Sequence, residues 1–219
     1  MLEVNSIYLY RNKKQIFKNF NLNLKEKEII LIAGDNGVGK TSLLDTISGL
    51  INPKTGSIKI NGKEINEIGE FRKNYFSYIP HKNCLKENLS INENLLSWLK
   101  LLNIEINNQD YQTKLKIFNL TNLQNKLINK LSHGQKKKVA LTKLLFSNTK
   151  LWLLDEPFNG IDQKSSKSLK KVMIEHTKKN GCILFSSHIE PDIKFTKKVI
   201  LKKTINKLQT KTFDNWEVL

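Results

Sequence analysis

The 219-residue sequence contains only two cysteines and four prolines, and its 20 acidic residues are far fewer than its 37 lysines and arginines. Cys84 and Cys182 stand far apart, and neither has neighbours at the spacing of a metal-binding motif. We therefore expect a reducing compartment and cysteines in ordinary packing positions. No apolar run approaches the roughly 18 residues needed to cross a bilayer, and the N-terminus passes directly into strand-like alternation. Neither a targeting peptide nor a membrane-spanning helix is expected.

The formal net charge of +17 is compatible with nucleic acid, an anionic membrane surface or no specific partner. The lysines are spread along the whole chain among asparagines and isoleucines, and are not gathered in one stripe with interleaved aromatic residues. This spread is typical of the composition of an AT-rich genome, so we expect no nucleic-acid partner. A weak attraction to anionic lipid headgroups is a secondary consequence of the charge.

The most specific signal is a glycine-rich stretch between a short apolar run at 29–32 and an amphipathic run that follows it. Strand, loop and helix in this order match the pattern G-x-x-x-x-G-K-[ST], in which backbone N–H groups turn inward on the phosphates of a nucleotide. We expect Lys40 to reach the β- and γ-phosphates and Thr41 to ligate Mg²⁺, with the positive end of the helix favouring the anion. The candidate nucleotide contacts are Gly34, Asp35, Asn36, Gly37, Val38, Gly39, Lys40, Thr41 and Ser42.

Three segments around this loop, 2–10, 20–24 and 57–60, carry apolar residues at alternate positions. They are predicted to be short, half-buried antiparallel strands. The nucleotide would then sit where an antiparallel layer meets a parallel core. Tyr10, or alternatively Tyr8, is a candidate to stack on the base, although an aromatic residue at a strand end can equally form the edge of the core.

A helical insert is predicted at about residues 88–148. Ser90 and Glu93 have the spacing of a capping box, and apolar residues follow them at helical intervals. The chain from there to about Leu127 is therefore expected to be entirely helical.

A further helix is predicted to begin at Ser132, because Gln135 stands again in capping-box spacing. A small hydroxyl beside Gly134 at a helix N-terminus is a second candidate anion site. This signal is weak by itself, since many helices begin with serine.

A continuous apolar run at 151–154, typical of a buried parallel strand, ends in two carboxylates, Asp155 and Glu156. Open α/β sheets bind ligands at the carboxyl ends of their strands, so both side chains are expected to face the phosphates. We assign Asp155 to Mg²⁺ and Glu156 to polarising the attacking water. A second buried strand at 182–185 leads to His188 at the same edge, which makes this histidine a candidate sensor of the γ-phosphate.

With the glycine loop, the segments 131–135 and 151–156, and His188 in this order, the chain resembles the nucleotide-binding subunit of an ABC transporter over nearly its whole length. The resemblance implies an α/β fold, a P-loop NTPase cassette with a parallel core sheet, an antiparallel β subdomain and a helical subdomain, in one domain spanning 1–219. It also implies ATP as substrate, Mg²⁺ as cofactor and ATP hydrolysis coupled to transport. The implied partners are a second copy of the chain and a separate membrane subunit with several spans.

In this family the motif Leu-Ser-Gly-Gly-Gln of one subunit closes over the nucleotide held by the glycine loop of another. The resemblance therefore implies that Ser132, Gly134 and Gln135 contact the nucleotide of a second copy, with His133 crowding the loop between them. His81 occupies a position usually held by glutamine. By the same resemblance, His81, Glu156 and His188 form the catalytic group.

His81 and the sequence around it also indicate one branch of this family. The residues 78–81, 85–95 and 151–158 resemble the ATP-binding subunit of the haem exporter used in cytochrome c maturation, which has histidine at the same place. This resemblance implies a peripheral protein on the cytoplasmic face of a bacterial inner membrane or, if organelle-encoded, on the matrix side of the mitochondrial inner membrane. Haem is expected as an indirect partner only, because no histidine here has the setting of an axial ligand.

The segment 81–97 is a candidate docking surface for the membrane subunit. It joins the phosphate crevice to the helical insert and carries Leu85, Leu89 and Ile91 among charged residues. Packing of these three side chains into the core is the alternative.

Other function classes fit the sequence less well. A DNA-repair ATPase of the same superfamily would need a long heptad insert before Ser132, a translation-factor ATPase would carry two cassettes, and a GTPase would carry Asn-Lys-x-Asp, which the residues 125–128 lack. The ATPase of another small-molecule or lipid exporter and a soluble ATPase of iron–sulfur assembly are alternatives that these motifs leave open.

Overall fold

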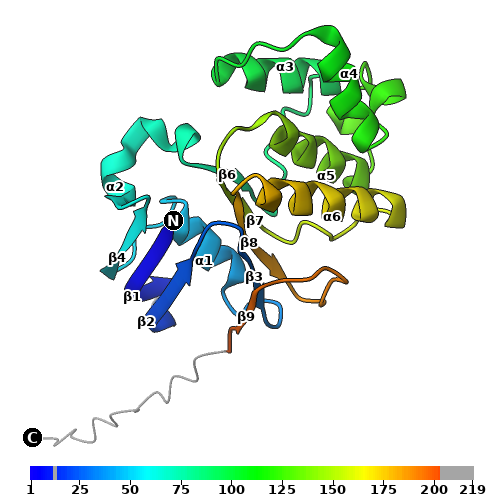
Figure 1. The fold of residues 1–219 in the computed structure, drawn as a ribbon. Helices are drawn as coiled ribbons and strands as arrows, with labels where there is room; N and C mark the ends of the chain where they lie inside the picture. The colour runs from blue at the N-terminus through cyan, green and yellow to red at the C-terminus, as the bar shows by residue number, and fades with distance from the viewer. Residues whose placement is uncertain (12–13, 203–219) are drawn as a thin grey trace, which may run out of the picture.

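A parallel sheet runs through the middle of the molecule (Figure 1). The computed structural model describes residues 1–11 and 14–202. Its larger sheet has five strands in the order β6-β7-β8-β3-β9, and every paired neighbour is parallel. These strands are β3 (Ile29–Ala33), β6 (Phe76–Ile79), β7 (Leu151–Leu154), β8 (Cys182–Ser187) and β9 (Lys197–Ile200). β7 and β8 are buried along their whole length, as expected of central parallel strands with continuous apolar sequence.

A separate antiparallel sheet packs beside the parallel one, with strand order β2-β1-β4-β5. Its strands are β1 (Leu2–Arg11), β2 (Lys14–Leu24), β4 (Thr55–Ile60) and β5 (Lys63–Glu64). The predicted antiparallel strands are confirmed, but β2 begins at Lys14 rather than near Phe20. Ser6 and Asn19 adopt positive φ angles of 50° and 52°, and the β1–β2 register shifts between Val4 and Ile7. Such irregularities interrupt strict alternation, so the sequence pattern reveals only the regular parts of the strands.

The helices are α1 (Lys40–Ile47), α2 (Ile65–Ile68), α3 (Ile91–Leu101), α4 (Asn108–Ile117), α5 (His133–Thr142) and α6 (Gln163–Lys178), and the 3₁₀ segments are η1 (Gly69–Asn74), η2 (Thr121–Leu123), η3 (Ile128–Lys130) and η4 (Lys143–Phe146). The two faces of the parallel sheet belong to different cores. α1 packs with one face and with the antiparallel sheet, whereas α3 to α6 pack with the other face. Figure 1 places α3 and α4 farthest from the antiparallel sheet. No helix within residues 1–11 and 14–202 is long and apolar enough to cross a membrane.

The expectation that the chain is entirely helical from Ser90 to about Leu127 is wrong. α3 begins at the predicted capping box but ends at Leu101. Between the end of α4 and Lys130 the chain forms only short 3₁₀ turns. Asn103 and Asn119 adopt positive φ angles of 55° and 56°, which a continuing right-handed helix does not allow. The chain therefore turns back on itself, and Ser90 forms an isolated antiparallel bridge with Leu127.

Candidate functional site

The glycine loop passes close beneath the antiparallel sheet where it joins β3 to α1. A Cβ atom on Gly39 would lie 2.6 Å from Cγ2 of Ile16, and φ of Gly39 is 111°, so both space and conformation require glycine there. Gly39 is also the N-cap of α1 and provides no side-chain hydrogen bond to the first turn. The backbone N–H groups at the start of α1 are thus available to an anion, which the helix dipole favours.

Lys40 is 6% exposed and its ammonium group lies inside the loop. Its Nζ donates to the carbonyl oxygens of Gly34 at 2.7 Å and Asp35 at 3.3 Å, and lies 3.3 Å from Oε1 of Glu156. Carbonyl oxygens and a carboxylate hold the ammonium group in this position. A phosphate that enters the loop can replace them as its partner without a large movement of Lys40.

Thr41 and Asp155 meet across the gap between the loop and the end of β7. Thr41 Oγ1 donates to Oδ2 of Asp155 at 2.7 Å, and Ser186 Oγ donates to Oδ1 at 2.5 Å. Asp155 is fully buried, and the hydrogen bonds from these two hydroxyls fix the orientation of its carboxylate. A threonine hydroxyl and one carboxylate fit Mg²⁺, which takes few protein oxygens and completes its shell with phosphates and water. No cluster of three or more His, Cys, Asp or Glu suited to a metal lies within the described residues.

Glu156 follows directly and adopts a positive φ of 45°, an uncommon conformation for a residue with a Cβ. Its backbone N–H donates to Ser186 Oγ at 2.9 Å. The carboxylate is 9% exposed and lies between Lys40, at Oε1, and His188, whose Nδ1 lies 2.9 Å from Oε2. An uncommon backbone conformation at a residue whose carboxylate contacts Lys40 favours a role in chemistry over one in packing.

These groups border a hollow of about 370 Å³. Its lining residues are Arg11, Ile16, Asn36, Gly37, Gly39, Lys40, Thr41, Ser42, His81 and Glu156. The structure thus brings together the glycine loop, His81 and Glu156, and it places Asp155 and His188 in direct contact with that group.

Tyr10 is not among the lining residues of this hollow. Its ring is 44% exposed, and Nζ of Lys54 lies 5.2 Å from the ring centroid. Side chains alternate along a strand, so the neighbouring Arg11 faces the loop instead, with Nη1 3.3 Å from Oγ of Ser42. Tyr8 is half-buried in the same strand.

Ser132, Gly134 and Gln135 lie at the start of α5, outside the lining of the hollow within the described chain. The predicted capping box is present: Ser132 Oγ accepts from the Gln135 N–H at 3.2 Å, and Gln135 Oε1 accepts from the Ser132 N–H at 3.0 Å. A Cβ on Gly134 would lie 2.2 Å from the Gly160 carbonyl oxygen. The start of α5 therefore packs tightly on the segment 157–162 that follows Glu156.

His133 is exposed and lies against the same segment. A Cβ on Gly160 would be only 2.8 Å from Nδ1 of His133, so the imidazole lies beside the Gly160 backbone. Gly160 has a φ of 75° and offers no side chain to displace the ring. His133 thus contacts the segment after Glu156 in its own chain, and its crowding of the loop around Ser132 and Gly134 stays a prediction.

Three residues of the site escaped the sequence reasoning. Arg11 lies in the hollow, Ser186 fixes Asp155 and Glu156, and Lys137 donates through Nζ to the Asp155 carbonyl oxygen at 2.9 Å. Lys137 is 2% exposed, and burial lowers its pKa to about 8. The helical spacing indicates that Lys137 is buried, because it stands three and four residues before the buried Ala140 and Leu141 of the same helix.

Comparison with known proteins identifies the family. The sequence model described as ABC transporter matches residues 17–159. A relative in Reclinomonas americana, named cytochrome c biogenesis ATP-binding export protein CcmA, is 37% identical over 212 residues, or 95% of this chain and 94% of the relative. A protein of the same name in Shewanella frigidimarina is 33% identical and covers 88% of both chains. Among solved structures, the dimeric cassette MJ0796 bound to ADP and Pi has a TM-score of 0.73 at 24% identity, covering 86% of this chain and 88% of that one.

Proposed function

The chain belongs to the ABC transporter family as an ATP-binding, ATP-hydrolysing subunit, and from this premise we propose that its ATP cycle powers haem export or delivery for cytochrome c maturation. The ATPase part is supported by one observation above all, the placement of the Glu156 carboxylate between Lys40 and His188. The haem part is supported by the relatives named for cytochrome c biogenesis and by His81, which borders the phosphate hollow.

The residues of the site have separable roles in hydrolysis. When the triphosphate enters, Lys40 moves from Glu156 to the β- and γ-phosphates, which frees the carboxylate to accept a proton from the attacking water. His188 contacts Glu156 through Nδ1, and it is proposed to hold this carboxylate in place and to donate to the γ-phosphate. His81, which faces the same hollow, is proposed to position the water. Thr41 and Asp155 would hold Mg²⁺, which neutralises charge on the phosphate oxygens when bound.

The base of ATP is proposed to stack on Tyr10, whose exposed ring stands at the end of β1 beside Arg11. Phosphates in the hollow would point the rest of the nucleotide towards this edge of the antiparallel sheet. Aromatic side chains stack on every base, so this contact would bind the nucleotide without strong selectivity.

The functional unit is proposed to contain two copies of this chain. The glycine loop supplies one face for the triphosphate, and Ser132, Gly134 and Gln135 lie outside the hollow at an exposed helix start. A second copy would bring these residues over the γ-phosphate and exclude water from it. Such a contact would form with ATP and loosen after hydrolysis.

A separate membrane protein is proposed to dock beside the segment 81–97, but through different side chains from those predicted. Ile91 is fully buried and Leu85 packs against the core, so the core alternative is right for both. The surface offered instead is a hollow of about 450 Å³ between β6 and the helices α3 and η4. Its lining residues are Leu50, Lys73, Phe76, Ser77, Tyr78, Ile79, Pro80, Asn83, Cys84, Trp98, Leu102, Lys143 and Leu144.

Two features make this hollow suitable for an apolar segment of a membrane subunit. Leu50, which lines the hollow, is 66% exposed, so a large apolar side chain is left in water there. Pro80 lines this hollow and the next residue in the chain, His81, lines the phosphate hollow, so a segment seated there would lie beside the element that borders the phosphates.

A genetic experiment tests the proposal as a whole. A strain in which Lys40→Ala replaces the native chain should assemble the membrane complex but fail to make holocytochrome c. Normal holocytochrome c with a defect in export of another molecule would indicate a different exporter. Absence of any membrane protein from the purified complex, together with a defect in iron–sulfur proteins, would indicate a soluble assembly ATPase. The complex would be expected on the cytoplasmic or matrix face of the inner membrane.

A further inference from the structure

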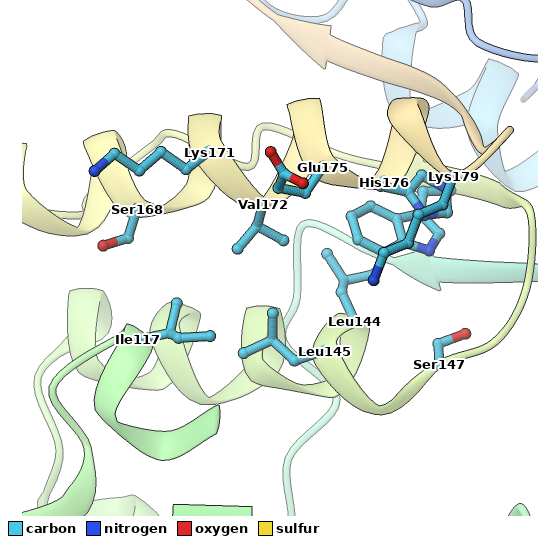
Figure 2. A pocket seen from close by; sticks show the side chains of 11 residues that line it. Ile117, Leu144, Leu145, Ser147, Ser168, Lys171, Val172, Glu175, His176 and Lys179 are labelled. Carbon is cyan, nitrogen blue, oxygen red and sulfur yellow. The ribbon is translucent and has the colours of Figure 1, made fainter. Parts of the chain in front are cut away.

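A third hollow, of about 450 Å³, lies between α6 and the η4 segment (Figure 2), on the face of the parallel sheet opposite to α1. It is lined by Ile117, Leu144, Leu145, Ser147, Trp152, Ser168, Lys171, Val172, Glu175, His176 and Lys179. Small-molecule sites have this size and this mixture of an apolar surface with a few polar groups. None of these residues takes part in the site proposed for ATP.

Apolar side chains line the hollow on two opposite walls. Figure 2 shows Ile117 and Leu145 on one wall and Val172 of α6 opposite them, with Leu144 deeper between the walls. Trp152 of β7 also lines the space, and its ring stacks on His176 with centroids 3.7 Å apart and planes 10° apart. An aliphatic chain would therefore find contacts on more than one side.

Most polar groups around the hollow already have partners. Ser147 is bonded to the hydroxyls of Ser77 and Thr149, at 2.6 and 2.9 Å. Nε2 of His176 lies 2.9 Å from the Lys150 carbonyl oxygen, and Glu175 is paired with Lys178 at 2.7 Å. Ser147, His176 and Oε1 of Glu175 are thus engaged.

The lining also contains a donor that has no partner among the described residues. Nε1 of Trp152 is buried and has no hydrogen-bond acceptor. Lys171 and Lys179 are exposed lysines. A buried N–H without an acceptor costs about 1–3 kcal/mol, which a suitable ligand would recover. The indole N–H and the two lysines give this hollow a donor and positive charge, which favour an anionic ligand.

Of the two lysines, Lys179 is the one that extends towards Leu144. Figure 2 shows its side chain entering the hollow from the C-terminal end of α6. The indole N–H is shielded from water, so an acceptor reaches it only if the wall of the hollow moves locally. A lysine stem is flexible enough to provide that movement when its ammonium group pairs with an incoming anion.

We propose that this hollow is a binding site for a medium-chain aliphatic carboxylate. The hydrocarbon chain lies along Leu145 and Val172, and the carboxylate lies between the ammonium group of Lys179 and the indole N–H of Trp152. Lys171 adds positive potential at the rim. The site requires neither ATP nor a second copy, and it shares only Leu144 with the hollow proposed for the membrane subunit.

Octanoate is the probe, and the full chain labelled with ¹⁵N-tryptophan provides the readout. The indole resonance of Trp152 is identified by its loss in Trp152→Phe, a change that keeps an aromatic ring against His176. Octanoate should shift this resonance in a saturable way and leave that of Trp98 unchanged. Octanol and octylammonium, which share the chain but not the charge, should bind at least about tenfold more weakly, as expected if an ion pair contributes about 1.4 kcal/mol.

The variants separate a built site from general apolar binding. Lys179→Gln should weaken octanoate at least about fivefold, the range of a partly desolvated charged hydrogen bond. Lys167→Gln, at an exposed position of the same helix outside the lining, is the matched control and should bind as the parent does. In Trp152→Phe, octanoate affinity followed through the methyl resonances of Val172 and Leu145 should fall as well. No saturable shift, equal binding of octanol, or full affinity in Lys179→Gln would each overturn the proposal.

Discussion

The Glu156 carboxylate and His188 make two contacts: Nδ1 lies 2.9 Å from Oε2, and the His188 backbone N–H donates to the same oxygen at 3.3 Å. Both contacts hold the carboxylate at the carboxyl edge of the parallel sheet, because Glu156 follows β7 and His188 follows the neighbouring strand β8. The other oxygen, Oε1, is left to Lys40. One carboxylate thus connects the phosphate loop with the end of the sheet.

Glu156→Gln should bind ATP with nearly the affinity of the parent but hydrolyse it at least about 10²-fold more slowly, since the change removes the base while keeping its shape. Nucleotide binding by fluorescence and phosphate release under single-turnover conditions measure the two effects separately. Glu175→Gln, on the exposed side of α6, is the control and should hydrolyse ATP normally. Normal turnover in Glu156→Gln would show that another group acts as the base.

Lys40→Ala should be defective in nucleotide binding, the step before hydrolysis. It removes a buried cation from the phosphates, and a charged hydrogen bond of about 1.5–3 kcal/mol corresponds to a loss of about 10- to 100-fold in affinity. Titration calorimetry with ATP and ADP measures the loss, and thermal unfolding checks that the variant folds. Parent-like affinity would contradict the role assigned to this lysine.

The parts of the fold that rest on strong periodicity were predictable. β7 and β8 were expected from continuous apolar runs and α5 from its capping box, because burial on both faces and cap chemistry leave local marks on the sequence. Breaks made by single residues were not, as Asn103 and Asn119 illustrate. Asparagine tolerates a positive φ but does not require it, so its presence alone does not end a predicted helix.

The site was predictable where one motif carries the chemistry and not where distant segments meet. Ser186 holds both Asp155 and Glu156, yet a serine in a buried strand has no distinguishing sequence pattern. Arg11 contacts Ser42 of α1 from the end of β1, beyond the register shifts that the β1–β2 pairing shows earlier along this strand, so its placement depends on how β1 pairs with β2. Long-range register of this kind depends on tertiary packing and is weakly encoded in one strand.

Arg11→Gln should weaken ATP and ADP to a similar degree, by about three- to tenfold, as expected for a partly exposed charged hydrogen bond. The argument is geometric: Arg11 borders the hollow and contacts Ser42 in the first turns of α1, a place that both nucleotides share. Titration of each nucleotide measures the effect, with the exposed Lys18→Gln of β2 as the control. A loss confined to ATP would place Arg11 at the γ-phosphate instead.

ATP should promote dimerisation of Glu156→Gln, whereas ADP should not, because a γ-phosphate contact across two copies favours the closed state only before hydrolysis. Analytical ultracentrifugation with each nucleotide measures this difference. Gly134→Ala should weaken the ATP dimer, because the new methyl group would meet the Gly160 carbonyl oxygen at 2.2 Å and displace the start of α5. Monomer at every ATP concentration, with the membrane partner present as well as absent, would count against the two-copy unit.

Asp162 should stabilise the chain in a way that acid removes. Its carboxylate is the N-cap of α6, accepting from the Ser165 N–H at 2.8 Å, and lies 3.1 Å from Nζ of Lys138. The Ser165 backbone hydrogen bond, with smaller help from Lys138, lowers the pKa of Asp162 to about 2. Replacing an N-cap aspartate by alanine costs about 0.5–2 kcal/mol of unfolding free energy, most of it from the cap because exposed ion pairs contribute little.

A carboxyl group whose pKa is lower in the folded chain stabilises the fold above its unfolded pKa, and this contribution is lost as the pH falls through the folded value. The difference in unfolding free energy between the parent and Asp162→Ala should therefore be constant above about pH 5 and shrink from about pH 4 downwards. Asp162→Asn caps the helix without titrating, so its difference from Asp162→Ala should not change over the same range. Urea unfolding of all three chains from pH 7 to pH 3 measures these differences. A parent-to-alanine difference that stays constant down to pH 3 would contradict the lowered pKa of Asp162, because the unfolded carboxyl group takes up its proton above that pH and the folded one does not. A difference that grows on acidification would contradict the assigned cap.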